Sequence, residues 1–399
     1  MDNDSLDYPV TLAALRRRWW AYVLFCTAFL ASSYALLLAA WEPSYALRWL
    51  AISSAAMVYP VAVLWRELKH NHRSGESTLL ASLGPGNLLS LLRGTLVSGL
   101  AGFIFSPWPS GWLAWLPGSL YILSDVTDFL DGYLARKSRQ ATRLGEILEM
   151  SFDGLGVLVG SLLIVQYGQA PIWYLWVAFA RYLFLGGIWL RRRLGKPVYD
   201  LPPSAMRRAF AAWQMGLVAA LLLPVFSPPG TTLAAILFTL PFLAGFLRDW
   251  LSVSGSDRQS GELAAGIKTA AESWLPLAVR ASLLLLTVAV LPDQFRDLGL
   301  QTPVVILIAL LEVVALLSVA AGFAGRVAAI VGLVILGIHQ NTGILVLLQY
   351  LMAVAYTVII FSGTGPYSLW KPEEYLIYRR IGERQATRNR VGILDETPG

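Results

Sequence analysis

The chain has 399 residues, of which 56% are hydrophobic and only 14% are charged, and its formal net charge is +6. Soluble domains carry about 25% charged residues, so this composition predicts an integral membrane protein rather than a soluble one. The positive charge does not indicate a nucleic-acid partner, because lysine and arginine collect in loops on one predicted side of the membrane.

Cys26 is the only cysteine and lies in an apolar run. A single thiol excludes disulfides, zinc cages and dithiol redox chemistry. The apolar runs are each close to the ~20 residues that a bilayer requires, and together they predict an all-α, polytopic transmembrane protein of about twelve spans.

Residues 1–80 form the first predicted part of the chain. A short interfacial helix, residues 1–18, ends in three arginines, and two apolar runs at 19–40 and 47–66 follow. A polar, basic loop comes after the second run. We therefore expect a two-helix hairpin with both ends on the cytoplasmic side.

Residues 81–252 form the second predicted part, a six-helix bundle. It opens on GPGNLLSLLRG, an entry broken by proline and glycine that carries Asn87 and Arg93 near the cytoplasmic end of the first helix. The six expected helices cover about residues 88–105, 112–134, 146–167, 171–190, 209–227 and 232–250.

Residues 253–272 are polar and rich in glycine and serine, which is typical of a linker between domains. Residues 273–399 follow as a four-helix bundle with a cytoplasmic tail. Its apolar runs lie at about 273–292, 303–321, 326–339 and 343–362. This topology places both termini in the cytoplasm and leaves only Arg48 and Arg296 as basic residues in outer loops.

Two pairs of carboxylates interrupt the apolar pattern of the six-helix bundle. Asp128 and Asp131 lie three residues apart, and Glu149 and Asp153 lie four apart, so each pair shares one face of a helix. One aspartate at the membrane centre costs about 2.5–3.5 kcal/mol, so the cluster needs a compensating cation. Carboxylate oxygens suit Mg²⁺ or Mn²⁺, and these ions commonly bridge phosphates.

The residues between the two pairs fit a phosphate ligand. Gly132 and Ala135 are small enough to let a base or a pyrophosphate approach the backbone, and Arg136 offers a fork for a phosphate. The reaction class that follows is metal-assisted displacement at phosphorus, in which a carboxylate deprotonates an attacking hydroxyl.

This run closely resembles the signature of the CDP-alcohol phosphotransferases, also called CDP-alcohol phosphatidyltransferases. The chain reads Asp128-x2-Asp131-Gly132-x2-Ala135-Arg136-x8-Gly145-x3-Glu149-x3-Asp153, and it differs from the family pattern only at Glu149, where the family has aspartate. The resemblance covers about residues 80–250. It implies a six-helix enzyme that moves a substituted phosphoryl group from a CDP-linked donor to an alcohol and releases CMP.

The resemblance also implies roles for individual residues. Asp128 and Asp131 are expected to bind metal at the donor's pyrophosphate, together with Glu149 and Asp153, and Asp153 is the expected general base. The expected nucleotide site comprises Asn87, Gly132, Ala135, Arg136 and Gly145. Glu149 leaves two possibilities open: a shifted metal with retained activity, or loss of the second metal.

Arg181 is an arginine in the middle of a predicted span. It either pairs structurally with a carboxylate or faces the cavity and binds a phosphate of the acceptor, as in relatives with phosphorylated acceptors. Lys196 and Arg207 lie in the following basic loop and helix start, and they either join that site or simply follow the positive-inside rule.

The C-terminal part carries Glu312 within hydrocarbon, followed by Gly322, Phe323 and Arg326. With Arg280 and the run SGTGPYSLW, this pattern resembles DoxX-like membrane domains over about residues 273–372. That resemblance is compatible with a regulatory, substrate-delivering or oligomerising role as well as with catalysis.

Three functions compete at this point. The first is phospholipid synthesis from CDP-diacylglycerol and a small or lipid alcohol, by an enzyme of the prokaryotic cytoplasmic membrane whose active site faces the cytoplasm and which forms a homodimer as the family commonly does. The second is a catalytically weakened homologue that acts as a structural or partner-binding module, which Glu149 suggests. The third is a transport or quinone-linked subunit, which the twelve spans and Glu312 suggest. The acidic constellation favours the first.

Overall fold

The computed structural model describes residues 4–73, 75–138, 141–201, 204–255, 274–288, 303–338, 344–365 and 367–373. Within these ranges the regular structure is helical, and β structure is limited to isolated bridges such as Arg73 with Thr142. The predicted all-α fold is confirmed. The helices are α1 (Asp4–Ala40), α2 (Pro43–Glu67), α3 (Gly84–Ala101), α4 (Leu116–Ser138), α5 (Arg143–Gln166), α6 (Leu175–Arg193), α7 (Ala205–Leu221), α8 (Gly230–Ser254), α10 (Pro303–Ala321), α11 (Gly325–Ile338) and α12 (Ile344–Ser362), with further helical residues at Trp274–Val288.

Five of these helices are long and apolar enough to cross a membrane. The qualifying segments are Tyr8–Ala40, Pro43–His70, Arg143–Gln166, Ile172–Arg193 and Gly230–Ser254. Shorter apolar helices follow at Trp274–Val288, Ile306–Ala321, Gly325–Ile338 and Val346–Ser362. The chain is therefore an integral membrane protein, and each predicted apolar run contains a helix.

The N-terminus differs from the expectation of a separate interfacial helix. Residues 1–18 were expected to stand apart from the span at 19–40, whereas α1 is one continuous helix of 37 residues. The stretch that joins the two parts, LAALRRRWW, contains no glycine or proline, so nothing in it breaks the helix.

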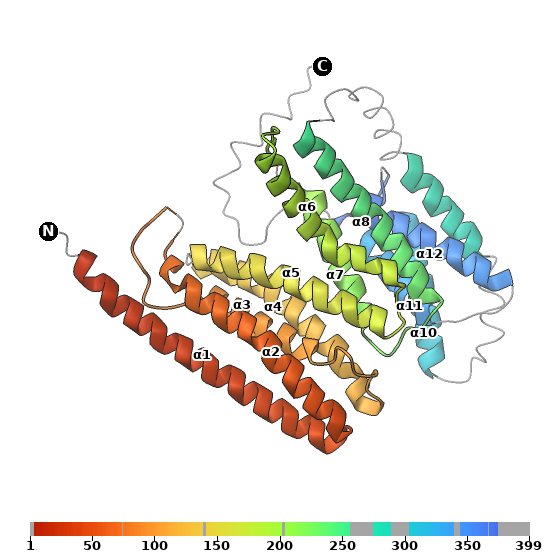
Figure 1. Ribbon diagram of the computed structural model, residues 1–399. Coiled ribbons are helices and arrows are strands. Elements are labelled where there is room, and N and C mark those ends of the chain that lie inside the picture. The colour runs from red at the N-terminus through yellow and green to blue at the C-terminus, as the bar shows by residue number, and fades with distance from the viewer. Residues whose placement is uncertain are drawn as a thin grey trace. The chain divides into compact units, whose positions relative to one another are not determined.

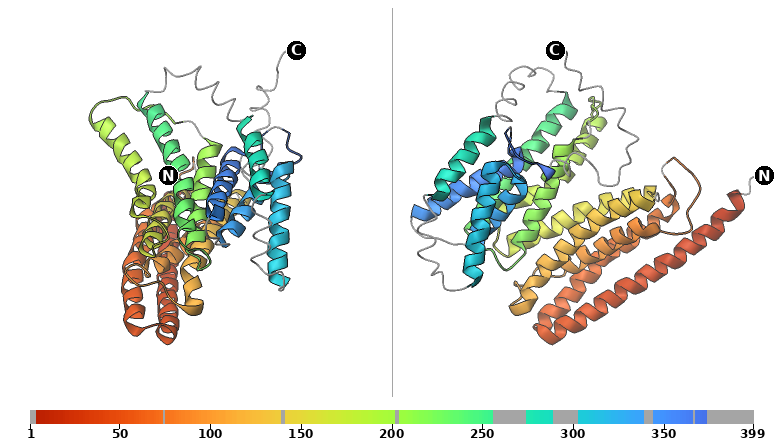
Figure 2. Two further views of the ribbon diagram at one scale, coloured as in Figure 1. Left: turned by 90° about the vertical axis from the view of Figure 1, so that its right-hand side faces the viewer. Right: turned by 180° about the vertical axis from the view of Figure 1, so that it is seen from behind.

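The first compact unit holds residues 1–102, 123–153 and 378–399, the last of which lie outside the described residues. In it, α1 packs along α2 and α2 along α3, and the three helices run side by side in every view (Figures 1 and 2). α3 approaches α2 closely, since a Cβ at Gly102 would lie 2.1 Å from Ser53 Oγ. The apolar core also takes in the first turns of α5, through Leu144, Leu148 and Phe152.

The second compact unit holds residues 103–122 and 154–377. Here α12 packs against α7 and α8 through Phe361, whose ring lies 4.8 Å from that of Trp213 and 5.4 Å from that of Phe238. α10, α11 and α12 pack in sequence order. The C-terminal helices thus share a core with the last two helices of the predicted six-helix bundle.

The predicted linker begins at the end of α8. Gly255 ends the helix in a left-handed conformation with φ 78°, and its N–H bonds the carbonyls of Leu251 and Ser252. Glycine reaches this conformation without steric cost, which makes it the usual residue after a helix end. Residues 256–273 lie outside the described residues.

Candidate active site

The predicted carboxylates come together in the first unit. α4 carries Asp128 and Asp131, and α5 carries Glu149 and Asp153. The charge of Asp128 interacts with those of Asp153 and Glu149, and the charge of Asp131 interacts with those of Asp128 and Glu149. Two helices that are joined by a short turn therefore present carboxylates whose charges repel one another.

Arg93 on α3 is the residue that compensates this charge in the structure. One of its terminal nitrogens lies 2.5 Å from Asp128 Oδ1 and the other lies 2.5 Å from Asp153 Oδ1. The arginine side chain is only 1% exposed, while the two aspartate side chains are 30% and 38% exposed. Charge-assisted bonds to a planar guanidinium are among the strongest in proteins. Arg93 thus ties α3, α4 and α5 together at the cluster.

Two further polar residues of α3 join the site at a spacing of three residues. The hydroxyl of Ser90 donates to Asp131 Oδ2 at 2.7 Å, and Asp131 is nearly fully buried, with 5% exposed. Asn87, Ser90 and Arg93 follow one another at intervals of three, which places them on one face of the helix. This polar face within an apolar helix was the sequence signal for Ser90 and Arg93, neither of which was predicted as a site residue.

Asn87 holds the turn between α4 and α5. Its Nδ2 donates to Thr142 Oγ1 at 3.0 Å and to Asn71 Oδ1 at 3.2 Å. Thr142 in turn accepts a bond from the N–H of Gly145 at 3.0 Å, which caps the start of α5. Asn87 and Gly145 are predicted to bind the nucleotide, and in the structure both belong to the hydrogen-bond network at the start of α5.

Gly145 packs directly against this network. A Cβ at Gly145 would lie 2.6 Å from Asn87 Oδ1, closer than real Cβ contacts come. We expect Gly145→Ala to destabilise the protein by about 1–3 kcal/mol, because either Asn87 or the first turn of α5 must move. The free energy of unfolding in mixed detergent micelles measures the effect.

Gly186→Ala is the matched control for this prediction. Gly186 is also helical, on α6, and a Cβ there would meet nothing within 4 Å. Alanine at such a position is expected to leave stability unchanged or to raise it by about 0.4–1 kcal/mol. Equal stability of the two variants would contradict the packing role of Gly145.

The remaining predicted residues lie at the end of α4 and in the second unit. Gly132 follows Asp131 directly and is partly buried, and Ala135 and Arg136 fall in the last turn of α4, with side chains outside the described residues. In the second unit, Arg181 lies on α6 and Lys196 is exposed just after it.

Arg207, on α7, forms an ion pair in the second unit. Its Nε lies 2.9 Å from Asp249 Oδ2 on α8, and the Asp249 side chain is 10% exposed. The charge of Arg207 is therefore already matched by a carboxylate, which makes a structural role for it as natural as a role in binding the acceptor.

The donor set suits a hard divalent cation. Four carboxylates supply only oxygen ligands, which Mg²⁺ and Mn²⁺ prefer, and their mutual repulsion is what such an ion relieves. In the structure the positive charge among them comes from Arg93, and within the described ranges no three His, Cys, Asp or Glu side chains are grouped closely enough to hold an ion.

The sequence matches a known family over this region. Residues 85–247 fit the family model of the CDP-alcohol phosphatidyltransferases. That segment contains α3 to α7 and most of α8, including every carboxylate of the cluster and Arg93. It does not reach the C-terminal helices α10 to α12.

Similar proteins include two named CDP-diacylglycerol–glycerol-3-phosphate 3-phosphatidyltransferase. The one from Cereibacter sphaeroides is 31% identical over 34% of this chain and 62% of its own length, and the one from Pseudomonas fluorescens is 28% identical over 41% and 84%. A putative cardiolipin synthase from Mycobacterium bovis is 28% identical over 28% of this chain and 54% of its own. The chain thus covers less than two thirds of the length of the Cereibacter and Mycobacterium relatives.

No solved structure matches the chain. The segment that matches the family includes the helices that carry the site. It begins one residue after the start of α3 and ends within α8. Residues 85–247 form a domain of the CDP-alcohol phosphatidyltransferase family.

Proposed function

We propose that this chain is a phospholipid-synthesising enzyme that transfers a phosphatidyl group from CDP-diacylglycerol to an alcohol and releases CMP. The observation that carries the proposal is the carboxylate cluster of α4 and α5, in which Asp128 and Asp153 form ion pairs with Arg93. These residues all lie within the segment that matches the family. The names of the Cereibacter and Pseudomonas relatives support glycerol 3-phosphate as the first acceptor to test.

The proposed reaction is a displacement at phosphorus. The acceptor hydroxyl oxygen forms a bond to the phosphorus that bears the diacylglycerol, and the bond from that phosphorus to the bridging oxygen breaks. The electron pair leaves with CMP, and Asp153 takes the hydroxyl proton as general base. The ion pair with Arg93 orients the Asp153 carboxylate on α5.

Asp128, Asp131, Glu149 and Asp153 would hold Mg²⁺ or Mn²⁺, which would neutralise the negative charge of the pyrophosphate. Gly132, Ala135 and Arg136 at the end of α4 would receive the nucleotide together with Asn87 and Gly145. Arg181, Lys196 and Arg207 are the candidates for an acceptor phosphate, and Arg207 also pairs with Asp249. We place the site and both termini on the cytoplasmic side of the membrane. The homodimer and the DoxX-like C-terminal domain also remain predictions.

A second candidate function is a non-catalytic membrane module. The observation that favours it is Glu149, which stands one methylene longer than the aspartate of the family pattern. A metal ligand displaced by about 1 Å can cost about 10²-fold in rate.

CMP release tests the proposed function. The full chain, purified in detergent, is incubated with CDP-diacylglycerol, glycerol 3-phosphate and Mn²⁺ or Mg²⁺, and CMP and the lipid product are measured by mass spectrometry. We expect CMP release that stops when EDTA removes the metal. A panel of inositol phosphate, serine and phosphatidylglycerol then identifies the acceptor.

Glu149→Asp separates the two candidate functions. Because a carboxylate remains at this position, we expect the rate to stay within about tenfold while the metal concentration for half-maximal rate shifts. CMP release by Glu149→Asp alone would favour the non-catalytic candidate. If neither form released CMP with any acceptor, catalysis by this chain would be excluded.

A further inference from the structure

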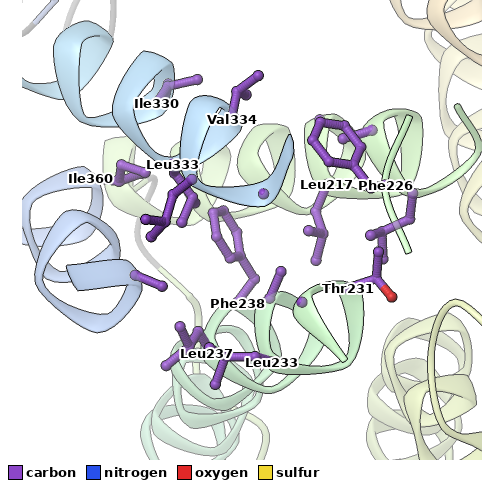
Figure 3. Close-up of a pocket in the computed structure, with 18 of the residues that line it drawn as sticks. Leu217, Phe226, Thr231, Leu233, Leu237, Phe238, Ile330, Leu333, Val334 and Ile360 are labelled. Atoms are coloured by element: carbon purple, nitrogen blue, oxygen red, sulfur yellow. The ribbon is translucent and has the colours of Figure 1, made fainter. Parts of the chain in front are cut away.

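An apolar cavity of about 460 Å³ lies in the second unit, among α7, α8, α11 and α12. Figure 3 shows side chains from these helices gathered around it, with Phe238 near the middle. Its volume falls within the ~300–1,000 Å³ of small-molecule sites. The cavity opens to the surface of the helices, since Ile330 and Val334 in its lining are 42% and 40% exposed.

Most residues that line the cavity are apolar, and the polar ones are Ser227, Thr231, Gln349 and Tyr350. The apolar side chains that meet in it include Leu217, Leu233, Leu237, Phe238, Leu333 and Ile360. A cavity whose lining is mainly apolar favours apolar molecules over water. The chemistry of the wall therefore selects a hydrocarbon ligand.

Two glycines keep the cavity open. Gly216 lies in α7 and Gly230 at the start of α8; both line the cavity, and a Cβ at either would meet nothing within 4 Å. A larger residue at these positions would project into space that no other side chain fills. The lining of α7 runs from Ala212 to Leu221, which at 1.5 Å per residue makes the cavity about 13 Å long.

One aromatic side chain of the cavity wall packs against a buried arginine. Trp213 lines the cavity, and the guanidinium of Arg326 lies 5.7 Å from the centre of its ring. Arg326 does not itself line the cavity and is only 5% exposed. The lining itself is therefore mainly apolar, which suits the hydrocarbon part of an amphiphile.

We propose that this cavity binds one acyl chain of a membrane phospholipid. The ligand is at hand, because the surrounding helices belong to an integral membrane protein and α8 is long and apolar enough to cross the bilayer. The cavity shares no lining residue with the carboxylate cluster, and α11 and α12 lie beyond the family domain. The site is thus distinct from the proposed transferase site and does not depend on its activity.

Photo-crosslinking tests the proposal. The full chain is reconstituted in phosphatidylcholine vesicles with phosphatidylglycerol that carries a diazirine in the middle of one acyl chain, and the labelled peptides are mapped by mass spectrometry. We expect adducts on residues 212–221 of α7 and 330–337 of α11. Gly216→Leu and Gly230→Leu each fill the cavity and are expected to lower this labelling about tenfold, equivalent to 1.4 kcal/mol.

Gly186→Leu is the matched control. Gly186 is a helical glycine on α6 with nothing within 4 Å of a Cβ, and it does not line the cavity, so its labelling should equal that of the unmodified chain. Two cavity-filling variants are made so that the test still stands if one of them does not fold. The midpoint of unfolding shows whether each variant is folded. Adducts confined to other helices, or unchanged labelling in a folded filling variant, would overturn the proposal whatever the rate of CMP release.

Discussion

Asp153→Asn is expected to lower the rate of CMP release by about 10²- to 10⁴-fold, the usual contribution of a general base. Asparagine keeps the shape of the side chain and cannot accept the hydroxyl proton. It also removes a negative charge from Arg93, which lies 2.5 Å from Asp153 Oδ1. The measurement is the initial rate of CMP release at saturating CDP-diacylglycerol and acceptor.

Glu146→Gln provides the control on the same helix. Glu146 lies in the first turn of α5 and pairs with Arg143 at 2.6 Å, with both side chains about half exposed. Exposed pairs of this kind contribute only about 0–1 kcal/mol, so the rate should not change. A rate for Asp153→Asn within tenfold of the unmodified chain would assign the proton transfer to another group.

The helices and the carboxylate pairs could be predicted from the sequence because both follow from local spacing. An apolar run of about 20 residues specifies a helix whatever packs around it. Asp128 and Asp131, or Glu149 and Asp153, share a face through helical geometry alone. The prediction that these two pairs belong to one site needed only the short turn between their helices.

The role of Arg93 could not be predicted in this way. Its two ion pairs join α3 to α4 and α5, and Asp128 lies 35 residues away in the chain. Such a contact depends on how three helices pack. The contact between Gly145 and Asn87 also depends on how helices pack. The cavity beside Gly216 and Gly230 likewise forms only where α7 and α8 meet α11 and α12.

Arg93→Met is expected to destabilise the protein by about 3 kcal/mol. Removal of one partner from a buried ion pair typically costs 3–5 kcal/mol, because the charge that remains is uncompensated, and the lower end applies here since Asp128 and Asp153 are partly exposed. Methionine fills much of the same volume, so the loss reports on charge rather than on a cavity. The free energy of unfolding in mixed micelles measures it.

Two comparisons isolate the ion pairs. Arg143→Met removes an arginine from an exposed pair with Glu146 and should cost no more than about 1 kcal/mol. Asp128→Asn in the Arg93→Met background should recover part of the lost stability, because it removes one of the two carboxylates that Arg93 compensated.

If added Mn²⁺ stabilised Arg93→Met more than the unmodified chain, the cation and the arginine would compensate the same carboxylates. If the two substitutions were strictly additive, Arg93 and Asp128 would be uncoupled and the ion pair would not hold α3 against α4.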